Sequence, residues 1–213
     1  MPPEITPAMR ALVESIDGDC DQTRGHGTRV GLLAARTGRA LGLPLQQQAM
    51  LELAGLLHDV GKLGLPTELL SKPGRLSHAE FELVRHHPRM GHQLLAPIGV
   101  PRPVLDAVLH HHENHDGSGY PHGLRGAAIP LTAQIIHVAD VFDALTSPRA
   151  YRSALTSEAA CDLLLRGSGR VTQPVVTLAF LRALARLRRI EPRVYARWFA
   201  HVPAEAVAQP ARL

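Results

Sequence analysis

The sequence has 213 residues, of which 45% are hydrophobic, 20% charged and only 4% aromatic. This length favours one domain with short extensions, and the apolar content excludes a fully disordered chain. The formal charge of +4 is mildly basic, so an anionic small molecule, a nucleic acid and no charged ligand all stay open. A core poor in aromatic residues suits helices better than a β-sandwich.

Cysteine usage and the termini bear on the cellular compartment. Two cysteines are too few for a disulfide framework or a cysteine zinc site, which fits a reducing environment. The first residues lack the apolar core of a signal peptide. The longest stretch without a formal charge, residues 126–139, is too short to span a bilayer. We therefore expect a cytoplasmic protein without a membrane segment.

Apolar residues recur at helical spacing in the first part of the chain. This spacing predicts helices over residues 24–41 and 45–58. Ser77 and Glu80 then have the spacing of a capping box, which predicts the start of a third helix.

The second part of the chain continues in the same way. Helices are predicted over residues 101–112 and 131–145, from Ser157, and from Pro174, which suits a first helical turn. Between them, residues 116–130 are rich in glycine and proline and are predicted to form a loop.

No region shows the alternation typical of strands, so the predicted fold class is all-α, a helical bundle with short connections. We expect an N-terminal helical extension over residues 1–19, one domain over residues 20–185, and a C-terminal helix and tail over residues 186–213. The basic, amphipathic end of the chain is expected to close the bundle rather than to bind a membrane or a nucleic acid.

Histidine is the unusual residue, with 13 in the chain and seven of them between His86 and His115. Metal binding is the first explanation to test for such a density. Asp140 interrupts an apolar helix face, where a carboxylate is costly to bury unless it is paired or metal-bound. Mixed imidazole and carboxylate ligands suit iron, manganese, zinc or nickel better than calcium or magnesium. The candidate ligands are His26, His58, Asp59, His87, His111, His112 and Asp140.

The alternative is a solvated cluster of polar side chains without a metal.

Two acidic residues are expected to orient the ligands from behind: Asp143, one turn after Asp140, and Glu113. The histidines at 86, 92, 110, 115 and 122 do not match ligand positions and are expected at the surface or behind the site.

These residues carry a resemblance to the HD-GYP branch of the HD superfamily of metal-dependent phosphohydrolases, over roughly residues 20–185. Residues 111–121 contain the tripeptide Gly119-Tyr120-Pro121 that names the branch. Residues 138–146 and 149–152 are also similar to its pattern, although the branch usually has proline where Ala150 stands.

The resemblance implies a binuclear centre, commonly of iron or manganese, with zinc and nickel as alternatives. One metal would take His26, His58, Asp59 and Asp140, and the other would take Asp59, His87, His111 and His112, with Asp59 as the bridge. Two such cations polarise a phosphodiester and lower the pKa of water. The implied activity is hydrolysis of cyclic di-GMP to linear pGpG, or onward to GMP.

Two positions bear on the extent of that reaction and on substrate contact. Some members of the branch hold a third metal with a glutamate where this chain has Gln22, so we expect two metals and the linear product. Lys62 is one of two lysines, and its ammonium can stabilise a phosphoryl oxygen, as a lysine does at this position in the branch. Further substrate contacts are expected from Gly119, Tyr120, Pro121, Arg149 and Arg152.

Two other functions stay open. The first is a signalling module that binds cyclic di-GMP or a diguanylate cyclase without catalysis, which Gln22 and Ala150 would favour. The second is an HD phosphohydrolase that acts on another nucleotide. We expect no nucleic-acid polymer and no membrane as partners, and the oligomeric state stays open, with a dimer as one option.

Overall fold

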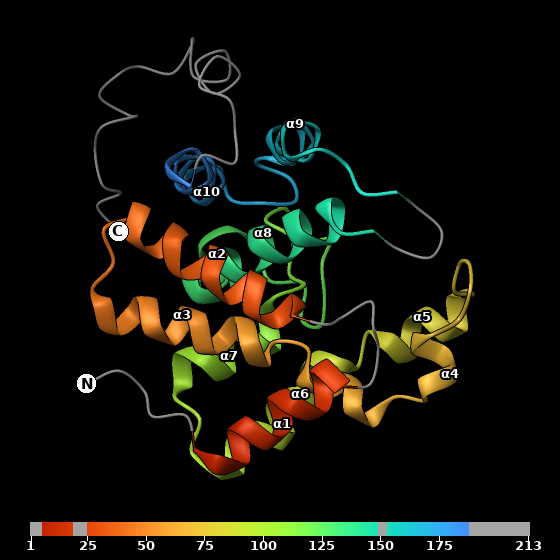
Figure 1. The fold of residues 1–213 in the computed structure, drawn as a ribbon. Coiled ribbons are helices and arrows are strands. Elements are labelled where there is room, and N and C mark those ends of the chain that lie inside the picture. Colours follow the sequence, from red (N-terminus) through yellow and green to blue (C-terminus); the bar gives the residue numbers. More distant parts are fainter. Residues whose placement is uncertain (1–5, 19–24, 149–152, 188–213) are drawn as a thin grey trace.

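The structure is a computed structural model, and it describes residues 6–18, 25–148 and 153–187. These residues form helices, with no strand among them, and most of the connections are short apart from residues 111–125 (Figure 1). The α-helices are α1 (Pro7–Gly18), α2 (His26–Ala40), α3 (Leu45–Leu57), α4 (Thr67–Leu70), α5 (His78–Val84), α6 (His87–Leu95), α7 (Arg102–His110), α8 (Leu131–Thr146), α9 (Ser157–Gly167) and α10 (Pro174–Arg186). Three 3-10 helices complete the set: η1 (Val60–Gly64), η2 (Ala96–Ile98) and η3 (Gly126–Ala128).

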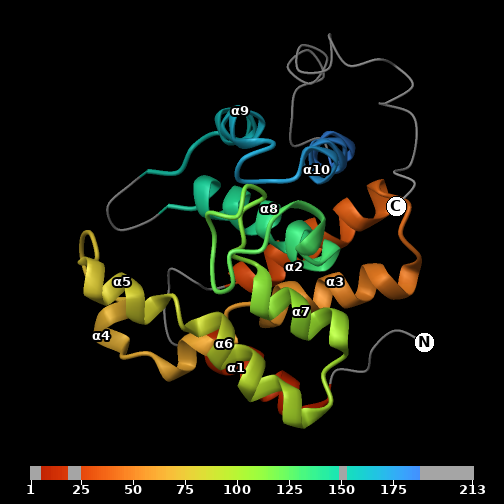
Figure 2. The same ribbon diagram turned by 180° about the vertical axis from the view of Figure 1, so that it is seen from behind.

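Helices α2 and α3 pack side by side in the middle of the molecule, and α7 and α8 lie against them (Figures 1 and 2). α9 and α10 cover α8 at one end, whereas α1 and α6 lie at the other end. α4 and α5 project to one side. The predicted all-α bundle is therefore confirmed.

The core is built mainly from aliphatic side chains, as the composition predicts. Leu57, Ile135 and Leu181 are fully buried. Two aromatic side chains join this core, where the rings of Phe142 and Phe180 meet edge to face with centroids 5.1 Å apart. Burial of each of these side chains stabilises the fold by about 1.5–3 kcal/mol.

Small residues let α2 and α3 approach backbone to backbone. A Cβ atom on Gly55 would collide with the backbone of Gly31, and one on Gly31 would come within 2.6 Å of the carbonyl oxygen of Glu52. This close contact brings the start of α2, with His26, next to the end of α3, with His58.

A second close approach joins η1 to α6. A Cβ atom on Gly61 would collide with the carbonyl of His87 and would lie 2.5 Å from the amide nitrogen of Gly91. Only glycine fits at such a distance. Asp59, two residues before Gly61, is thereby held beside His87.

The predicted helices are found within one or two residues of their expected ends, apart from the third. The capping box of Ser77 and Glu80 is formed, but the helix that it opens ends at Val84, and α6 begins at His87. Pro88 explains the break, because a proline at this position would clash with the carbonyl of Val84 in a continuous helix.

α1 lies within the expected N-terminal extension. Its Met9 is buried in the core, with 2% of its surface exposed. The domain boundaries themselves stay a prediction. None of the helices in the described part of the chain combines the length and the apolar character that a bilayer crossing requires. Several predictions fall outside the described residues: those on Gln22, Arg149, Ala150, Arg152 and the tail beyond residue 187.

Candidate metal centre

The first cluster of candidate ligands consists of His26, His58 and Asp140, from α2, the end of α3 and α8. The Nε2 atom of His26 lies 3.3 Å from Oδ1 of Asp140 and 3.3 Å from Nε2 of His58. His58 Nε2 lies 3.9 Å from the same Asp140 oxygen. Three donor atoms therefore converge on one point.

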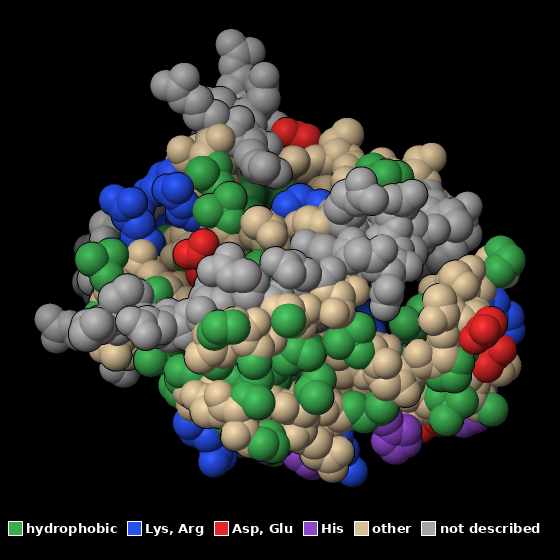
Figure 3. Space-filling model, turned by 60° about the horizontal axis from the view of Figure 1, so that its bottom comes forward, with side chains coloured by type: hydrophobic (Ala, Val, Ile, Leu, Met, Phe, Trp, Pro, Cys, Tyr) green, Lys and Arg blue, Asp and Glu red, His purple; other side chains and the backbone are tan. Residues whose placement is uncertain are grey.

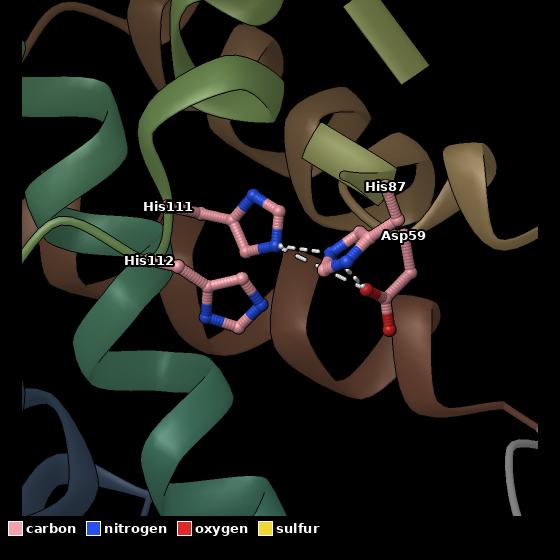
Figure 4. A group of neighbouring side chains, drawn as sticks. All are labelled: Asp59, His87, His111 and His112. Atoms are coloured by element: carbon pink, nitrogen blue, oxygen red, sulfur yellow. Dashed lines mark hydrogen bonds and ion pairs between the residues drawn. The ribbon is translucent and has the colours of Figure 1, made fainter. Parts of the chain in front are cut away.

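The second cluster consists of Asp59, His87, His111 and His112, whose ligand atoms all lie within 4.8 Å of one another. Figure 4 shows these side chains pointing toward a common centre. His87 Nε2 lies 3.3 Å from Asp59 Oδ1 and 3.3 Å from His111 Nε2. His58, His87 and His111 are each 1% exposed or less, so little of this histidine density reaches the surface. Accordingly, histidine occupies only a small part of the face in Figure 3.

Asp59 lies between the two clusters and offers one oxygen to each. Its Oδ1 faces the second cluster, whereas its Oδ2 lies 3.5 Å from Nε2 of His58 and 3.8 Å from Nε2 of His26. Lys62 Nζ donates to Oδ2 at 2.5 Å. The carboxylate therefore has the position of a bridging ligand.

Main-chain carbonyls orient three of the ligand rings. Nδ1–H of His58 donates to the carbonyl of Gly55 at 2.8 Å, and Nδ1–H of His111 donates to Val108 at 2.8 Å. His87 does the same to Val84 at 2.7 Å. Each acceptor lies in the last turn of a helix, where carbonyls lack a helical N–H partner. The bond fixes the proton on Nδ1 and leaves the lone pair of Nε2 for a metal.

His26 is held differently, by side chains. Its Nδ1–H donates to Oδ2 of Asp143 at 2.7 Å, and Arg29 donates to both carboxylate oxygens of Asp143 at 2.7 and 3.0 Å. A carboxylate behind a ligand imidazole is the usual support of a metal-binding histidine. The place predicted for Asp143, behind a ligand, is where the structure puts it, whereas Arg29 was missed. Its position one turn after His26 was the available signal.

Electrostatics keep both carboxylates ionised. Burial alone would raise the pKa of Asp59, but Lys62 and His58 hold it well below its usual range. Burial likewise opposes ionisation of Asp140, and its hydrogen bond with His26 keeps the pKa well below the usual range. Both groups can therefore bind a cation without first losing a proton.

The histidines differ in their protonation. Burial lowers the pKa of His58 and His111, and lowers that of His112 to about 3, so these rings are neutral. Burial also opposes the charge of His26, but hydrogen bonds to Asp140 and Asp143 outweigh it and raise the pKa to about 10. His26 therefore carries a proton that a metal must displace.

These observations are the test of whether the donor set fits metal ions. The neutral imidazoles of His58, His111 and His112 and two ionised carboxylates, one of which faces both clusters, suit divalent cations of the transition series. In a solvated polar cluster, by contrast, the rings would be exposed and free to turn. The two clusters are able to bind metal ions.

The Gly119-Tyr120-Pro121 loop packs against the second cluster at His112. A Cβ atom on Gly119 would collide with the carbonyl of His112, so the chain passes directly under this ligand, and Tyr120 N–H donates to that carbonyl at 3.1 Å. The Tyr120 ring stacks on His112 with centroids 4.7 Å apart, and Arg85 lies 5.0 Å over the ring. Tyr120 thus packs beside the ligands, which leaves its contact with a substrate a prediction.

Glu113 occupies a different place from the predicted one. Its side chain is buried, and its two oxygens accept the backbone N–H groups of His122 and Leu124 at 2.7 and 3.0 Å. It therefore fixes the loop rather than a ligand ring. Arg89 adds a bond to the carbonyl of Pro121 at 3.2 Å.

His137 was also missed from the sequence. Its Nδ1–H donates to the carbonyl of His111 at 2.7 Å, so it supports a ligand from behind. It lies on the largely buried helix α8, three residues before Asp140, where a histidine among apolar residues was the available signal.

Residues 10–174 match the HD domain family. The chain is 42% identical over 166 residues to the cyclic di-GMP phosphodiesterase response regulator RpfG of Xanthomonas campestris, a match that covers 76% of this chain and 43% of that protein. It is 39% identical over 153 residues to 3'3'-cGAMP-specific phosphodiesterase 1 of Vibrio cholerae, over 72% of this chain and 36% of the relative.

The fold agrees with these matches. The crystal structure of a Vibrio cholerae cyclic GMP-AMP-specific phosphodiesterase, V-cGAP3, superimposes with a TM-score of 0.65 at 18% identity, over 93% of this chain and 54% of that one. The chain thus spans less than half the length of the two curated relatives described above.

Proposed function

We propose that this chain, which belongs to the HD domain family and to its HD-GYP branch, is a metal-dependent phosphodiesterase that hydrolyses cyclic di-GMP to linear pGpG. The catalytic unit would lie within residues 20–185. The two oxygens of Asp59 carry this proposal, because they face two different groups of histidines. That arrangement supports a binuclear centre rather than a single structural metal.

The two clusters would hold one divalent cation each, with iron or manganese favoured, and Asp59 would serve both. When bound, such cations supply Lewis-acid polarisation of the phosphodiester and a nucleophile from water at neutral pH. The burial of His58, His87 and His111 keeps bulk water away from the donor atoms, which strengthens every charge interaction at the site.

Lys62 is proposed to contact the scissile phosphate. Its side chain is 31% exposed, and its Nζ atom lies at the edge of the centre on Asp59. An ammonium at this position can neutralise charge that develops on a non-bridging phosphoryl oxygen. The same role for Arg149 and Arg152, at the other phosphate or at a guanine edge, rests on the sequence pattern.

The test is turnover by the full chain loaded with manganese, or with iron under reducing conditions, followed by chromatography of the products. We expect linear pGpG from cyclic di-GMP, two metal ions per chain in the manganese-loaded protein, and loss of activity after chelation. No turnover with either metal would refute the proposal. Calorimetry that finds tight binding of cyclic di-GMP without hydrolysis would instead favour a signalling module, which could also bind a diguanylate cyclase.

A second substrate is favoured by one observation, the 39% identity to a 3'3'-cGAMP-specific phosphodiesterase. The same assay therefore includes 3'3'-cGAMP beside cyclic di-GMP. The substrate with the higher kcat/KM decides between them, because discrimination is a difference in transition-state binding.

A further inference from the structure

His110, Glu113 and His122 form a third group of metal-ligand side chains, outside the two clusters of the proposed active site. We propose that these three residues, which we name the outer site, bind a borderline divalent cation such as Zn²⁺ and fasten the Gly119-Tyr120-Pro121 loop to the end of α7. This inference does not depend on the proposed phosphodiesterase activity. It also departs from the expectation that His110 and His122 are not ligands.

The distances fit a metal ion with little movement. One ligand atom from each residue lies within 4.8 Å of the others, and His110 Nδ1 lies 3.8 Å from Oε1 of Glu113. Zinc binds imidazole nitrogen and carboxylate oxygen at about 2.0–2.2 Å in tetrahedral geometry, so two of its ligands lie about 3.3–3.6 Å apart, slightly closer than these two atoms. The third ligand, His122, is exposed and can complete the contact by a change of rotamer.

One buried nitrogen of the outer site lacks a partner among the described residues. His110 Nδ1 is buried and has no hydrogen-bond partner among the described residues. Native structures rarely leave such an atom unsatisfied. The rings of His110 and His122 lie 5.1 Å apart between centroids, so the unpartnered nitrogen is near a second imidazole as well as a carboxylate.

Glu113 has the capacity to bind a cation in addition to its loop contacts. Its side chain is fully buried, and its two oxygens accept one backbone N–H each. A carboxylate has about four lone-pair sites, so these bonds use only half of its capacity. Its negative charge lies beside His110 without a Lys or Arg partner in the described part of the chain, and a cation would neutralise it.

The donor chemistry selects the class of ion. Two imidazoles and one carboxylate are the ligands of zinc sites that keep a fourth position for solvent, and the exposure of His122 leaves that position accessible. Affinity of such donors for divalent metals rises from manganese toward zinc. Manganese-loaded protein should therefore hold two ions, whereas protein in excess zinc should hold three.

A cation here would link two parts of the loop structure that are otherwise joined by hydrogen bonds. His110 directly precedes His111 and His112, and His122 directly follows Pro121. Tyr120, on the same loop, stacks on His112. The outer site would therefore hold the residues that flank the ligands of the second cluster, and would not touch those ligands directly.

The test compares zinc content between full-length variants after equilibration in excess Zn²⁺ and removal of free ion. We expect His122→Gln and His110→Gln each to contain one zinc fewer per chain than the parent, and to lose one binding event in a Zn²⁺ titration. His78→Gln removes an exposed histidine from α5, far along the chain from the outer site, and should retain the parent's zinc content.

The same comparison is repeated in the Asp59→Ala background, which removes the shared ligand of the two clusters. A difference of one zinc between Asp59→Ala and Asp59→Ala/His122→Gln, with equal far-ultraviolet circular dichroism, would support the outer site whether or not the chain is an active phosphodiesterase. The proposal would be overturned if His122→Gln left the zinc content unchanged both in the parent and in the Asp59→Ala background. A loss of the same size in His78→Gln would also overturn it, because the zinc would then be bound non-specifically by surface histidines.

Discussion

The two clusters of candidate ligands contain similar residues but are held in different ways. In the second cluster, carbonyls at helix ends orient His87 and His111, so the ring positions follow from the fold itself. In the first cluster, the carbonyl of Gly55 orients His58 in the same way, but His26 depends on Asp143, which depends in turn on Arg29. The difference teaches that the first cluster has one ligand, His26, whose orientation a single side-chain substitution can weaken, whereas His87 and His111 are fixed by the backbone.

Asp59→Ala should affect both clusters at once, because it removes the carboxylate whose two oxygens face the two groups of histidines. We expect loss of both metal ions and a fall in turnover of more than about 10³-fold. Elemental analysis and the product assay measure the two effects. The matched control is Asp106→Ala, which removes an acid whose ion pair with Arg102 lies at the surface. A variant at position 59 that retained both metals and full turnover would contradict the bridge.

Lys62→Ala should lower turnover without changing metal binding by either cluster. We expect kcat to fall by about 10²–10³-fold while the metal content is unchanged, because the ammonium is proposed to contact the substrate and an ammonium is not a metal ligand. Lys72→Ala is the control, since Lys72 is the other lysine of the chain and pairs with Glu80 at the surface. Equal kcat values for the two variants would remove Lys62 from the mechanism.

Asp143→Asn sharpens the comparison because it acts on one cluster only. A neutral amide supports His26 less well, so we expect the affinity of the first cluster for its metal to fall by about 10–100-fold. The second cluster should keep its affinity. Calorimetric titration with Mn²⁺ should show one weakened and one unchanged event, and Asp106→Asn should show two unchanged events. Equal weakening of both events would mean that the clusters are not held independently.

Proton release gives the smallest of the expected effects. Because the pKa of His26 is raised to about 10 in the absence of metal, binding at pH 8 should release about one proton per chain from this residue. His58, His111 and His112 are already neutral and should release none.

The sign of this effect follows from competition between the proton and the metal. Apparent metal affinity should rise with pH below about 10 and level off above it. Titrations in two buffers of different ionisation enthalpy measure the release, and Asp143→Asn should move its midpoint to lower pH. Absence of release at pH 8 would show that His26 is neutral before the metal binds.

Much of the fold was predictable because helices leave a periodic pattern. The spacing of apolar residues gave the ends of α2, α3 and α8 closely, and Ser77 with Glu80 gave the start of α5. The end of α5 was not predicted, although Pro88 was the available signal, because a proline ends a helix in the turn that precedes it.

The candidate ligands were predictable because charged and imidazole side chains interrupt apolar faces. Their supports were not, since Arg29 and His137 are ordinary residues until the fold brings them to Asp143 and to the carbonyl of His111. Glu113 illustrates the same limit. Its sequence position beside the ligands suggested a role toward them, but the chain turns back so that its carboxylate meets the loop instead.

The three imidazoles that bond to carbonyls in the last turns of α3, α5 and α7 have a consequence for how this sequence can change. Each ring bonds a carbonyl at a helix end through Nδ1 and directs Nε2 toward the candidate metal site. The position of that helix end therefore sets the position of Nε2. Insertion of one residue into a helix rotates everything after it by about 100°. Substitutions on the outer faces of these helices should therefore be tolerated far better than insertions or deletions within them, even where an insertion touches no ligand.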